Sequence, residues 1–245
     1  MRNQSFPLGA FQLAGLCLLL LISSVAAANQ FGTTAYGLAA TDYGNLSVIS
    51  GPNNGSYSAT ADAQEMQLGF AHGHADASIG SLSVFGYADA SCCGNAGAQG
   101  LAQFSDTLTV TGSGMANFTF GFSTDPHCQG PQGSISLSAN LQADGEGVSS
   151  NSCVATVQSV VVSASAGQTI NLSGSLDVYV VAPLGSIAAG SDPFQVFITP
   201  LTQGDGYISA SGIVYPTAPV PEPSSLLLGG PGIVSLLWLV RRKLL

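Results

Sequence analysis

Apolar and polar residues alternate along most of the chain between residues 29 and 214. The clearest case is the stretch 134–141, in which Ile135, Leu137 and Ala139 share one face and serines occupy the other. A period of two residues is typical of β-strands that bury one face, and helical periodicity is nearly absent. The pattern therefore predicts an all-β domain over residues 29–214.

Short alternating runs recur with Gly-, Pro- and Asn-rich turns between them. We expect residues 46–50 and 56–60 to form a hairpin around the turn 52–55. About ten such strands predict an antiparallel two-sheet sandwich of jelly-roll type. The predicted strands cover residues 46–50, 56–60, 67–78, 82–87, 103–111, 117–122, 134–141, 154–163, 169–181, 194–199 and 207–214.

Positive charge is missing from this region, because no Lys or Arg lies between Asn3 and Val240. Charged residues make up 7% of the chain, against about a quarter in ordinary soluble proteins. A nucleic-acid interface needs a basic face, so this function class is excluded. Enzymes that hold phosphate with a Lys or Arg clamp are excluded for the same reason.

The N-terminus has the layout of a secretory signal. Arg2 precedes an apolar stretch centred on residues 16–22, and the small residues Ala26, Ala27 and Ala28 follow. We predict a signal peptide over residues 1–28, which the secretion machinery recognises and signal peptidase removes. The alternative is an uncleaved anchor, but the continuous apolar core is too short to cross a bilayer.

The C-terminus has three parts. A proline-rich linker, residues 215–225, carries Pro221, Glu222 and Pro223; an apolar run follows over 226–240. The basic tail 241–245 then supplies Arg241, Arg242 and Lys243 as a stop-transfer signal. Fifteen helical residues reach about 22 Å, short of the ~30 Å hydrocarbon core, which suits a temporary transmembrane sorting helix. An ordinary tail anchor is the alternative.

This order of parts resembles the PEP-CTERM sorting signal, and the resemblance covers residues 220–243. In that family a membrane-embedded protease-transpeptidase, an exosortase, reads the signal in Gram-negative bacteria that make extracellular polysaccharide. The resemblance implies an exosortase-type partner. It also implies an intermediate anchored in the inner membrane, which ends at the cell surface or outside the cell. Pro231 and the final Leu244-Leu245 depart from the family pattern.

Four cysteines remain after removal of the signal peptide: Cys92, Cys93, Cys128 and Cys153. Export favours disulfides, each of which would contribute about 3–4 kcal/mol. A bond between adjacent cysteines is strained, so we expect Cys92 and Cys93 to pair with Cys128 and Cys153 in one of two ways. A zinc site is the alternative, but the C-x-x-C spacing is absent.

The most suggestive polar cluster is His72, His74 and Asp76, which would share one face of a strand. Two imidazoles and a carboxylate can bind zinc, copper or iron. The alternative is a solvent-facing strand, which would show the same pattern without binding a metal ion. His127 could approach this face from a loop. The turn 144–147 (Asp-Gly-Glu-Gly) could contact a divalent cation such as calcium, or it is simply a solvated turn.

No catalytic motif is present. A G-x-S-x-G nucleophile elbow is missing, and the two glutamates of the mature domain, Glu65 and Glu146, form no recognisable pair for glycoside hydrolysis. The sequence therefore predicts a protein that is not an enzyme and needs no cofactor.

Our main hypothesis is an exported structural or adhesive protein of the extracellular matrix, associated with exopolysaccharide or biofilm. The first alternative is a carbohydrate-binding module, for which two or three aromatic side chains should line one exposed face. A metal-dependent polysaccharide-active enzyme, built on His72, His74 and Asp76, is the second alternative. The aromatic candidates named from the sequence are Tyr57, Phe70, Tyr87 and Tyr179.

Overall fold

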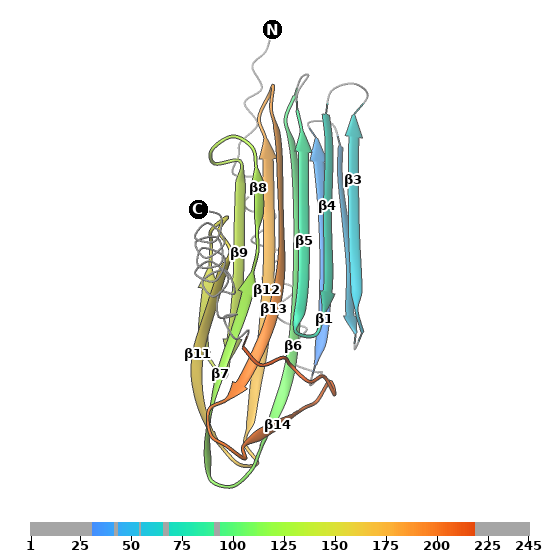
Figure 1. Cartoon of the computed structure of the whole chain (residues 1–245). Helices are drawn as coiled ribbons and strands as arrows, with labels where there is room; N and C mark the ends of the chain where they lie inside the picture. The colour runs from blue at the N-terminus through green and yellow to red at the C-terminus, as the bar shows by residue number, and fades with distance from the viewer. Residues whose placement is uncertain (1–30, 42–43, 54, 66–68, 91–93, 219–245) are drawn as a thin grey trace, which may run out of the picture.

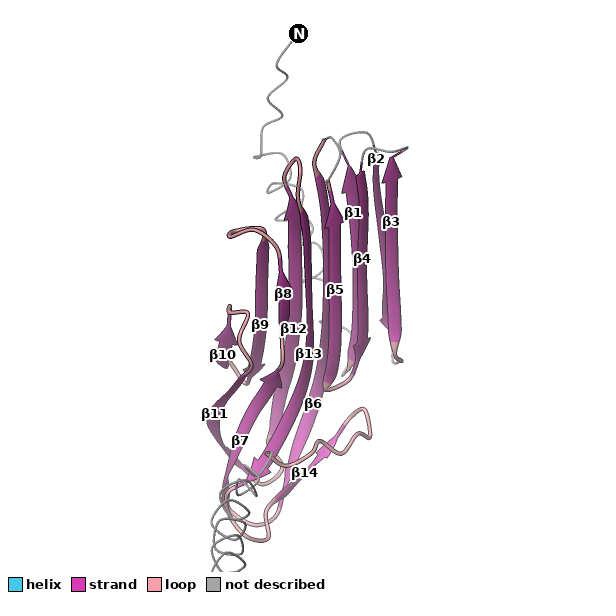
Figure 2. Ribbon diagram, turned by 45° about the horizontal axis from the view of Figure 1, so that its top comes forward, coloured by secondary structure: helices cyan, strands magenta, loops and turns pink. Residues whose placement is uncertain are grey.

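The computed structural model describes residues 31–41, 44–53, 55–65, 69–90 and 94–218. The predicted signal peptide, the PEP motif, the sorting helix and the basic tail lie outside these residues, as do Cys92 and Cys93. Every regular element in the described residues is a strand (Figure 2). No helix among them has the length and hydrophobicity that a membrane span requires.

The strands form two seven-stranded antiparallel sheets, packed face to face (Figure 1). Sheet A has the order β10-β9-β12-β6-β1-β2, with β14 beside β6; sheet B has the order β11-β7-β13-β5-β4-β3, with β8 beside β13. Sheet A contains β1 (Gly32–Thr41), β2 (Gly44–Asn53), β6 (Ala96–Thr111), β9 (Ile135–Ala143), β10 (Glu146–Ser150), β12 (Thr169–Ala182) and β14 (Gly206–Ser209). Sheet B contains β3 (Tyr57–Glu65), β4 (Gly69–Ser78), β5 (Ser81–Asp89), β7 (Met115–Thr124), β8 (His127–Gln129), β11 (Thr156–Ser165) and β13 (Ile187–Pro200).

The predicted antiparallel sandwich is thus confirmed, but one predicted hairpin is wrong. β2 pairs with β1 in sheet A, whereas β3 pairs with β4 in sheet B. The connection around residue 55 therefore crosses from one sheet to the other. Alternation shows that a strand has a buried face, but it does not show which partner completes its hydrogen bonds.

The acidic turn at 144–147 is the bend of a hairpin between β9 and β10. Asp144 and Gly145 have positive φ angles of 52° and 89°. Two central residues with positive φ form the type I′ turn that suits the twist of paired strands, and Asp-Gly is a preferred sequence for it. The Asp144 N–H also donates to the Asn171 carbonyl of β12, at 2.9 Å.

The two sheets touch backbone to backbone on one side of the molecule, which we call the thin side: β1, β3, β4, β5 and the first half of β6. A Cβ atom on Gly73 would collide with the carbonyl oxygens of Leu38 and Gln99, and one on Gly100 with the carbonyl of His74. Most inward residues here are Gly and Ala, because larger side chains do not fit between sheets that approach below the usual ~10 Å; Leu82 and Val84 of β5 are larger inward residues. The buried alanines here include Ala35, Ala39, Ala59, Ala61, Ala71, Ala75, Ala98 and Ala102.

Large side chains hold the sheets apart on the opposite, thick side. Phe118, Phe120 and Phe122 occupy successive inward positions of β7 and are almost fully buried. Phe122 stacks on Phe194 of β13, with ring centroids 4.8 Å apart, and Phe194 also contacts Phe104 of β6 at 6.5 Å. The sandwich is therefore a wedge whose thickness follows the size of its inward residues.

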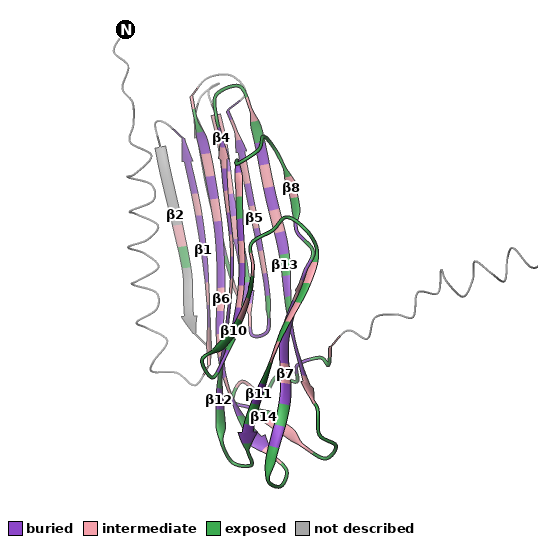
Figure 3. Ribbon diagram, turned by 90° about the vertical axis from the view of Figure 1, so that its left-hand side faces the viewer, coloured by how far each residue is buried: buried purple, intermediate pink, exposed green. Residues whose placement is uncertain are grey.

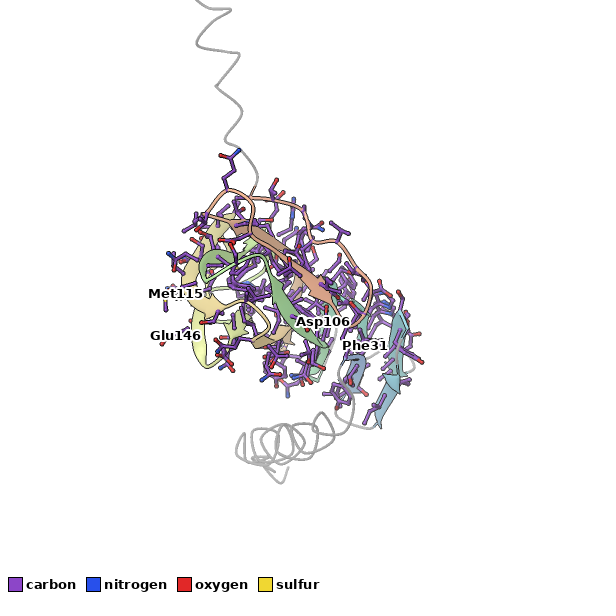
Figure 4. All side chains as sticks on the ribbon, turned by 90° about the horizontal axis from the view of Figure 1, so that it is seen from below. Phe31, Asp106, Met115 and Glu146 are labelled. Carbon is purple, nitrogen blue, oxygen red and sulfur yellow. A yellow bond between two sulfur atoms is a disulfide. The ribbon has the colours of Figure 1, made fainter. Side chains whose placement is uncertain are left out.

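A strap of residues 206–218 closes the thick side. Its β14 joins sheet A, and its later residues bind sheet B, where the Ile198 N–H donates to the Pro216 carbonyl at 2.9 Å. The strap is fixed to Asp106, which is 2% exposed and lies among the packed side chains at this end (Figure 4). Asp106 Oδ2 accepts from the hydroxyls of Ser209, Ser211 and Tyr215 at 2.6, 2.9 and 2.8 Å. Neutral donors alone thus satisfy a buried carboxylate.

One disulfide joins Cys128 of β8 to Cys153, in the loop between β10 and β11. The predicted pairing of these cysteines with Cys92 and Cys93 is therefore wrong. The loop passes from the edge of sheet A to the edge of sheet B and brings Cys153 beside β8, with 5.9 Å between the Cα atoms. The bridge closes a loop of 25 residues, worth about 3–4 kcal/mol in the chain-entropy model.

Asp192 occupies an inward position of β13 and is 1% exposed. Its Oδ1 accepts from the Asp125 N–H at 3.1 Å, whereas its Oδ2 has no hydrogen-bond partner in the described part of the chain. Burial, together with the Asp125 carboxylate, raises the pKa of Asp192 to about 7, although the Asp125 N–H and His127 oppose the shift. On β12, burial also raises the pKa of Asp177 to about 6.

These raised pKa values predict a domain that loses stability as pH increases. The folded state holds its protons more tightly than the unfolded state, so the free energy of unfolding should fall between about pH 4 and pH 7. Asp192→Asn mimics the protonated side chain. The free energy of unfolding of this variant should therefore fall less over this pH range than that of the unaltered protein, by on the order of 2–4 kcal/mol. Urea unfolding across this pH range checks it, and an unchanged slope in the variant would contradict the assignment.

The thin side predicts an unequal response to two alanine substitutions on one strand. Gly100→Ala should lower the free energy of unfolding by about 1–3 kcal/mol, because backbone must move to admit the methyl group. Gly97→Ala is the matched control, since its Cβ would contact only the Val180 carbonyl oxygen, at 3.5 Å. Its effect should stay within about 0.5 kcal/mol. Urea unfolding followed by circular dichroism measures both, and equal losses would show that the sheets have room at Gly100.

Candidate functional site

His72, His74 and Asp76 lie on the outer face of β4, as the alternation predicts. Their neighbours Ala71, Gly73, Ala75 and Ala77 are buried against sheet A, so the polar residues must face outward (Figure 3). The imidazoles remain about 30% exposed, with side-chain values of 28% for His72 and 29% for His74. The close contact of the two sheets thus presents both rings from a rigid surface.

Each imidazole is bound to its own carboxylate. His72 Nδ1 lies 2.5 Å from Asp62 Oδ1, and His74 Nε2 lies 2.9 Å from Asp76 Oδ2. Thr60 Oγ1 contacts His74 Nδ1 at 2.8 Å. Thr60 and Asp62 belong to β3, where the register places them directly opposite His74 and His72. Sequence reasoning missed both, because only the β3–β4 register brings them to the histidines.

The surroundings of Asp76 favour its ionised form. Partial burial raises the pKa of Asp76, but hydrogen bonds from Ser58, His74 and Ser83, together with the charge of His74, outweigh it and hold the pKa below its usual value. The Ser83 hydroxyl donates to Asp76 Oδ2 at 3.3 Å. The face therefore keeps negative charge and hydrogen-bond acceptors close to the imidazoles.

The histidines and carboxylates do not converge on a common point. Among the described residues, no group of three or more His, Cys, Asp or Glu side chains is arranged to hold a metal ion. His127 lies on β8, and β13 and β5 separate it from β4. Its Nδ1 contacts the Asp125 carbonyl oxygen, at 3.1 Å. His72, His74 and Asp76 thus share a face but form separate ion pairs.

Thr60, His74 and Asp76 form a hydroxyl–imidazole–carboxylate relay, the order of groups found in a catalytic triad. A triad also needs N–H donors aimed at the oxyanion beside the nucleophile. Here β3 and β4 are paired without a register break, so the backbone N–H groups between them lie in the plane of the sheet. The relay therefore orients the imidazole but offers no oxyanion hole on this face.

Aromatic rings continue the outer face from β4 onto β5. We call Phe70, His72, His74, Phe85 and Tyr87 the aromatic strip. Phe70 contacts Tyr87 with ring centroids 5.9 Å apart, His72 contacts Phe85 at 5.5 Å, and the two imidazoles stack at 6.4 Å. All five are partly exposed. From residue 70 to residue 74 the strip runs about 13 Å along β4.

Carboxylates and hydroxyls border the strip. The Tyr87 hydroxyl donates to Asp89 Oδ2 at 3.4 Å, and burial and the nearby Asp89 charge raise the pKa of Tyr87. Asp62 and Asp76 border the strip on the side of the histidines. The described chain has no Lys or Arg, so negative charge here is opposed only by imidazole.

The other aromatic candidates lie elsewhere. Tyr57 packs against the core at the start of β3, and Tyr179 faces outward from β12 on sheet A. Phe85 was not among the sequence candidates, although its place at i−2 from Tyr87 on an alternating strand is a signal that could have identified it.

Comparisons with known proteins give one distant likeness. No protein-family model matches the chain, and none of the curated proteins does. A solved structure of TmCBM61 in complex with beta-1,4-galactotriose is similar at 10% identity, covering 66% of this chain and 87% of that one, with a TM-score of 0.20.

Proposed function

We propose that this protein is an exported, non-catalytic protein that binds neutral polysaccharide through the aromatic strip. The observation that supports it most is the continuous row of partly exposed rings on the outer face of β4 and β5. Sugar rings present C–H groups that pack on aromatic faces, and their hydroxyls bond to flanking polar groups. Asp62, Asp76, Asp89 and Ser83 supply those polar groups.

The shape of the site favours the interior of a polysaccharide chain over its end. The strip lies on the open face of a sheet and runs about 13 Å along β4, so it can accept more than one sugar unit side by side. The sheet contact beneath it holds the rings in place before binding, which reduces the entropy lost on association.

Export and sorting complete the proposal. The disulfide between Cys128 and Cys153 is consistent with an extracellular domain. We propose that the signal peptide and the PEP-CTERM-like segment direct the protein through the inner membrane to an exosortase-type protease, and then to the surface or the medium. There, polysaccharide binding would make it a structural or adhesive component of the matrix.

Removing one ring from the strip should abolish most of the binding. Tyr87→Ala should weaken retardation of the protein in native gels cast with neutral polysaccharides by tenfold or more, because a stacking surface and a hydroxyl are both lost. Tyr179→Ala, a partly exposed tyrosine on the opposite sheet, is the matched control and should bind as the unaltered protein does. Absence of retardation by any polysaccharide would refute the proposal, and loss in the Tyr179 variant alone would move the site to sheet A.

The acidic border predicts selectivity against anionic glycans. At low salt, neutral glucans or galactans should retard the protein, whereas a polyuronate such as alginate should not, because its carboxylates meet Asp62, Asp76 and Asp89 without a Lys or Arg to offset them. Asp62→Asn together with Asp76→Asn should reduce the difference. Equal retardation of the unaltered protein by neutral and anionic polysaccharides would contradict the predicted charge selectivity. It would not contradict binding at the aromatic strip.

A further inference from the structure

Four strands end the main strand orders of the two sheets, and three of them carry features that discourage pairing with another chain. These edges are β2 and β10 in sheet A, and β3 and β11 in sheet B. The short strands β8 and β14 also have one partner each, but they span only three and four residues. β10 has only five residues and begins with the charged Glu146. β3 contains the charged residues Asp62 and Glu65. β2 contains Pro52 near its end, and its register against β1 is shifted. Short length, charge, proline and irregular pairing all protect sheet edges.

β11 has none of these protections. It pairs with β7 over ten residues without a register break, and no described strand is hydrogen-bonded to its other edge. The segment from Thr156 to Ser165 contains no charged residue and no proline. Val157 and Val161 face outward from it and are 58% and 54% exposed (the strand is visible beside β7 in Figure 1). An open edge of this length offers unpaired N–H and C=O groups flanked by apolar side chains.

The central residues of β11, 159–163, are complementary to themselves in the antiparallel direction. If two copies pair about Val161, each Val161 faces the Val161 of the other copy on the outer face. Val160 then faces Val162 of the other copy on the inner face, where both side chains already pack toward the core. Ser159 faces Ser163, so no polar group meets an apolar one at the centre.

Charge also favours this strand as the meeting point of two copies. The chain has a formal net charge of −9, so identical copies repel one another over most of their surface. An uncharged edge is where two such molecules approach at the least electrostatic cost. The occupant that fits the edge is thus a second copy of the same chain, which brings the same uncharged, β-forming sequence.

We propose that β11 pairs antiparallel with β11 of a second copy across a twofold axis at Val161, and joins the two copies of sheet B into one continuous sheet. Both sides of this contact are the same surface, so the assembly closes as a dimer and does not extend into a fibre. The dimer carries two aromatic strips, which would give avidity for long polysaccharides. The pairing itself does not depend on polysaccharide binding.

Cysteine cross-linking of the mature, exported protein tests the register. In Val161→Cys the two Cα atoms would lie about 4.5–5.5 Å apart, within disulfide range. In Val157→Cys, an equally exposed control on the same strand, they would lie about 27 Å apart. Mild oxidation should give a covalent dimer on non-reducing gels for the first variant only. Dimers from both variants, or from neither, would overturn the proposed pairing.

Sedimentation analysis supplies a readout that needs no cysteine. The unaltered protein should sediment as a dimer, and Val161→Lys should sediment as a monomer with an unchanged thermal transition, because two ammonium groups would face each other on the twofold axis. Met115→Lys, an exposed position 71% accessible at the end of β7, should remain dimeric. A monomeric unaltered protein at the highest soluble concentration would refute the dimer.

Discussion

The contact between the backbones of the two sheets on the thin side constrains most of what the molecule presents. Where Gly73 of β4 lies against Leu38 and Gln99, even a methyl group has no room to point inward. Apolar burial per residue is therefore small there, and stability depends on complete hydrogen-bond ladders and close dispersion contact. The outer face of the thin side is stiff because the two backbones touch beneath it. Its outward side chains therefore keep their spacing without support from neighbouring loops.

The absence of Lys and Arg from the described residues imposes a second constraint. A carboxylate in a folded protein can be stabilised by a cation, by neutral donors or by protonation. Asp106 is satisfied by hydroxyl and amide donors, His72 and His74 each contact one carboxylate, and Asp192 keeps an unpartnered oxygen with a raised pKa. The same lack of cations makes the aromatic strip unsuited to anionic ligands. The way in which the carboxylates are stabilised and the proposed ligand specificity thus both follow from the absence of Lys and Arg.

The alternation of apolar and polar residues was enough to predict most strands. It also predicted that His72, His74 and Asp76 share a face, because strand geometry alone decides which residues lie on the same side. It could not find the partners of those residues. The position of Asp62 beside His72, the Cys128–Cys153 bridge and the separation of β2 from β3 all depend on register and on which sheet each strand joins. Such choices are settled by packing between distant segments, and a single sequence does not display them.

The two sides of the wedge suit different tasks. A flat, thin region with inward Ala and Gly exposes a regular row of side chains, and such a surface can match the repeat of a polymer better than a curved loop can. The thick side contains the aromatic core, the Asp106 hydrogen bonds and the strap that leads toward the C-terminal linker. The strap also reaches the thin side, because a Cβ atom on Gly80, in the turn between β4 and β5, would collide with the Tyr215 ring. The proposed attachment or processing of the C-terminus would therefore act on a segment that the Asp106 hydrogen bonds and the β4–β5 turn both hold in the fold.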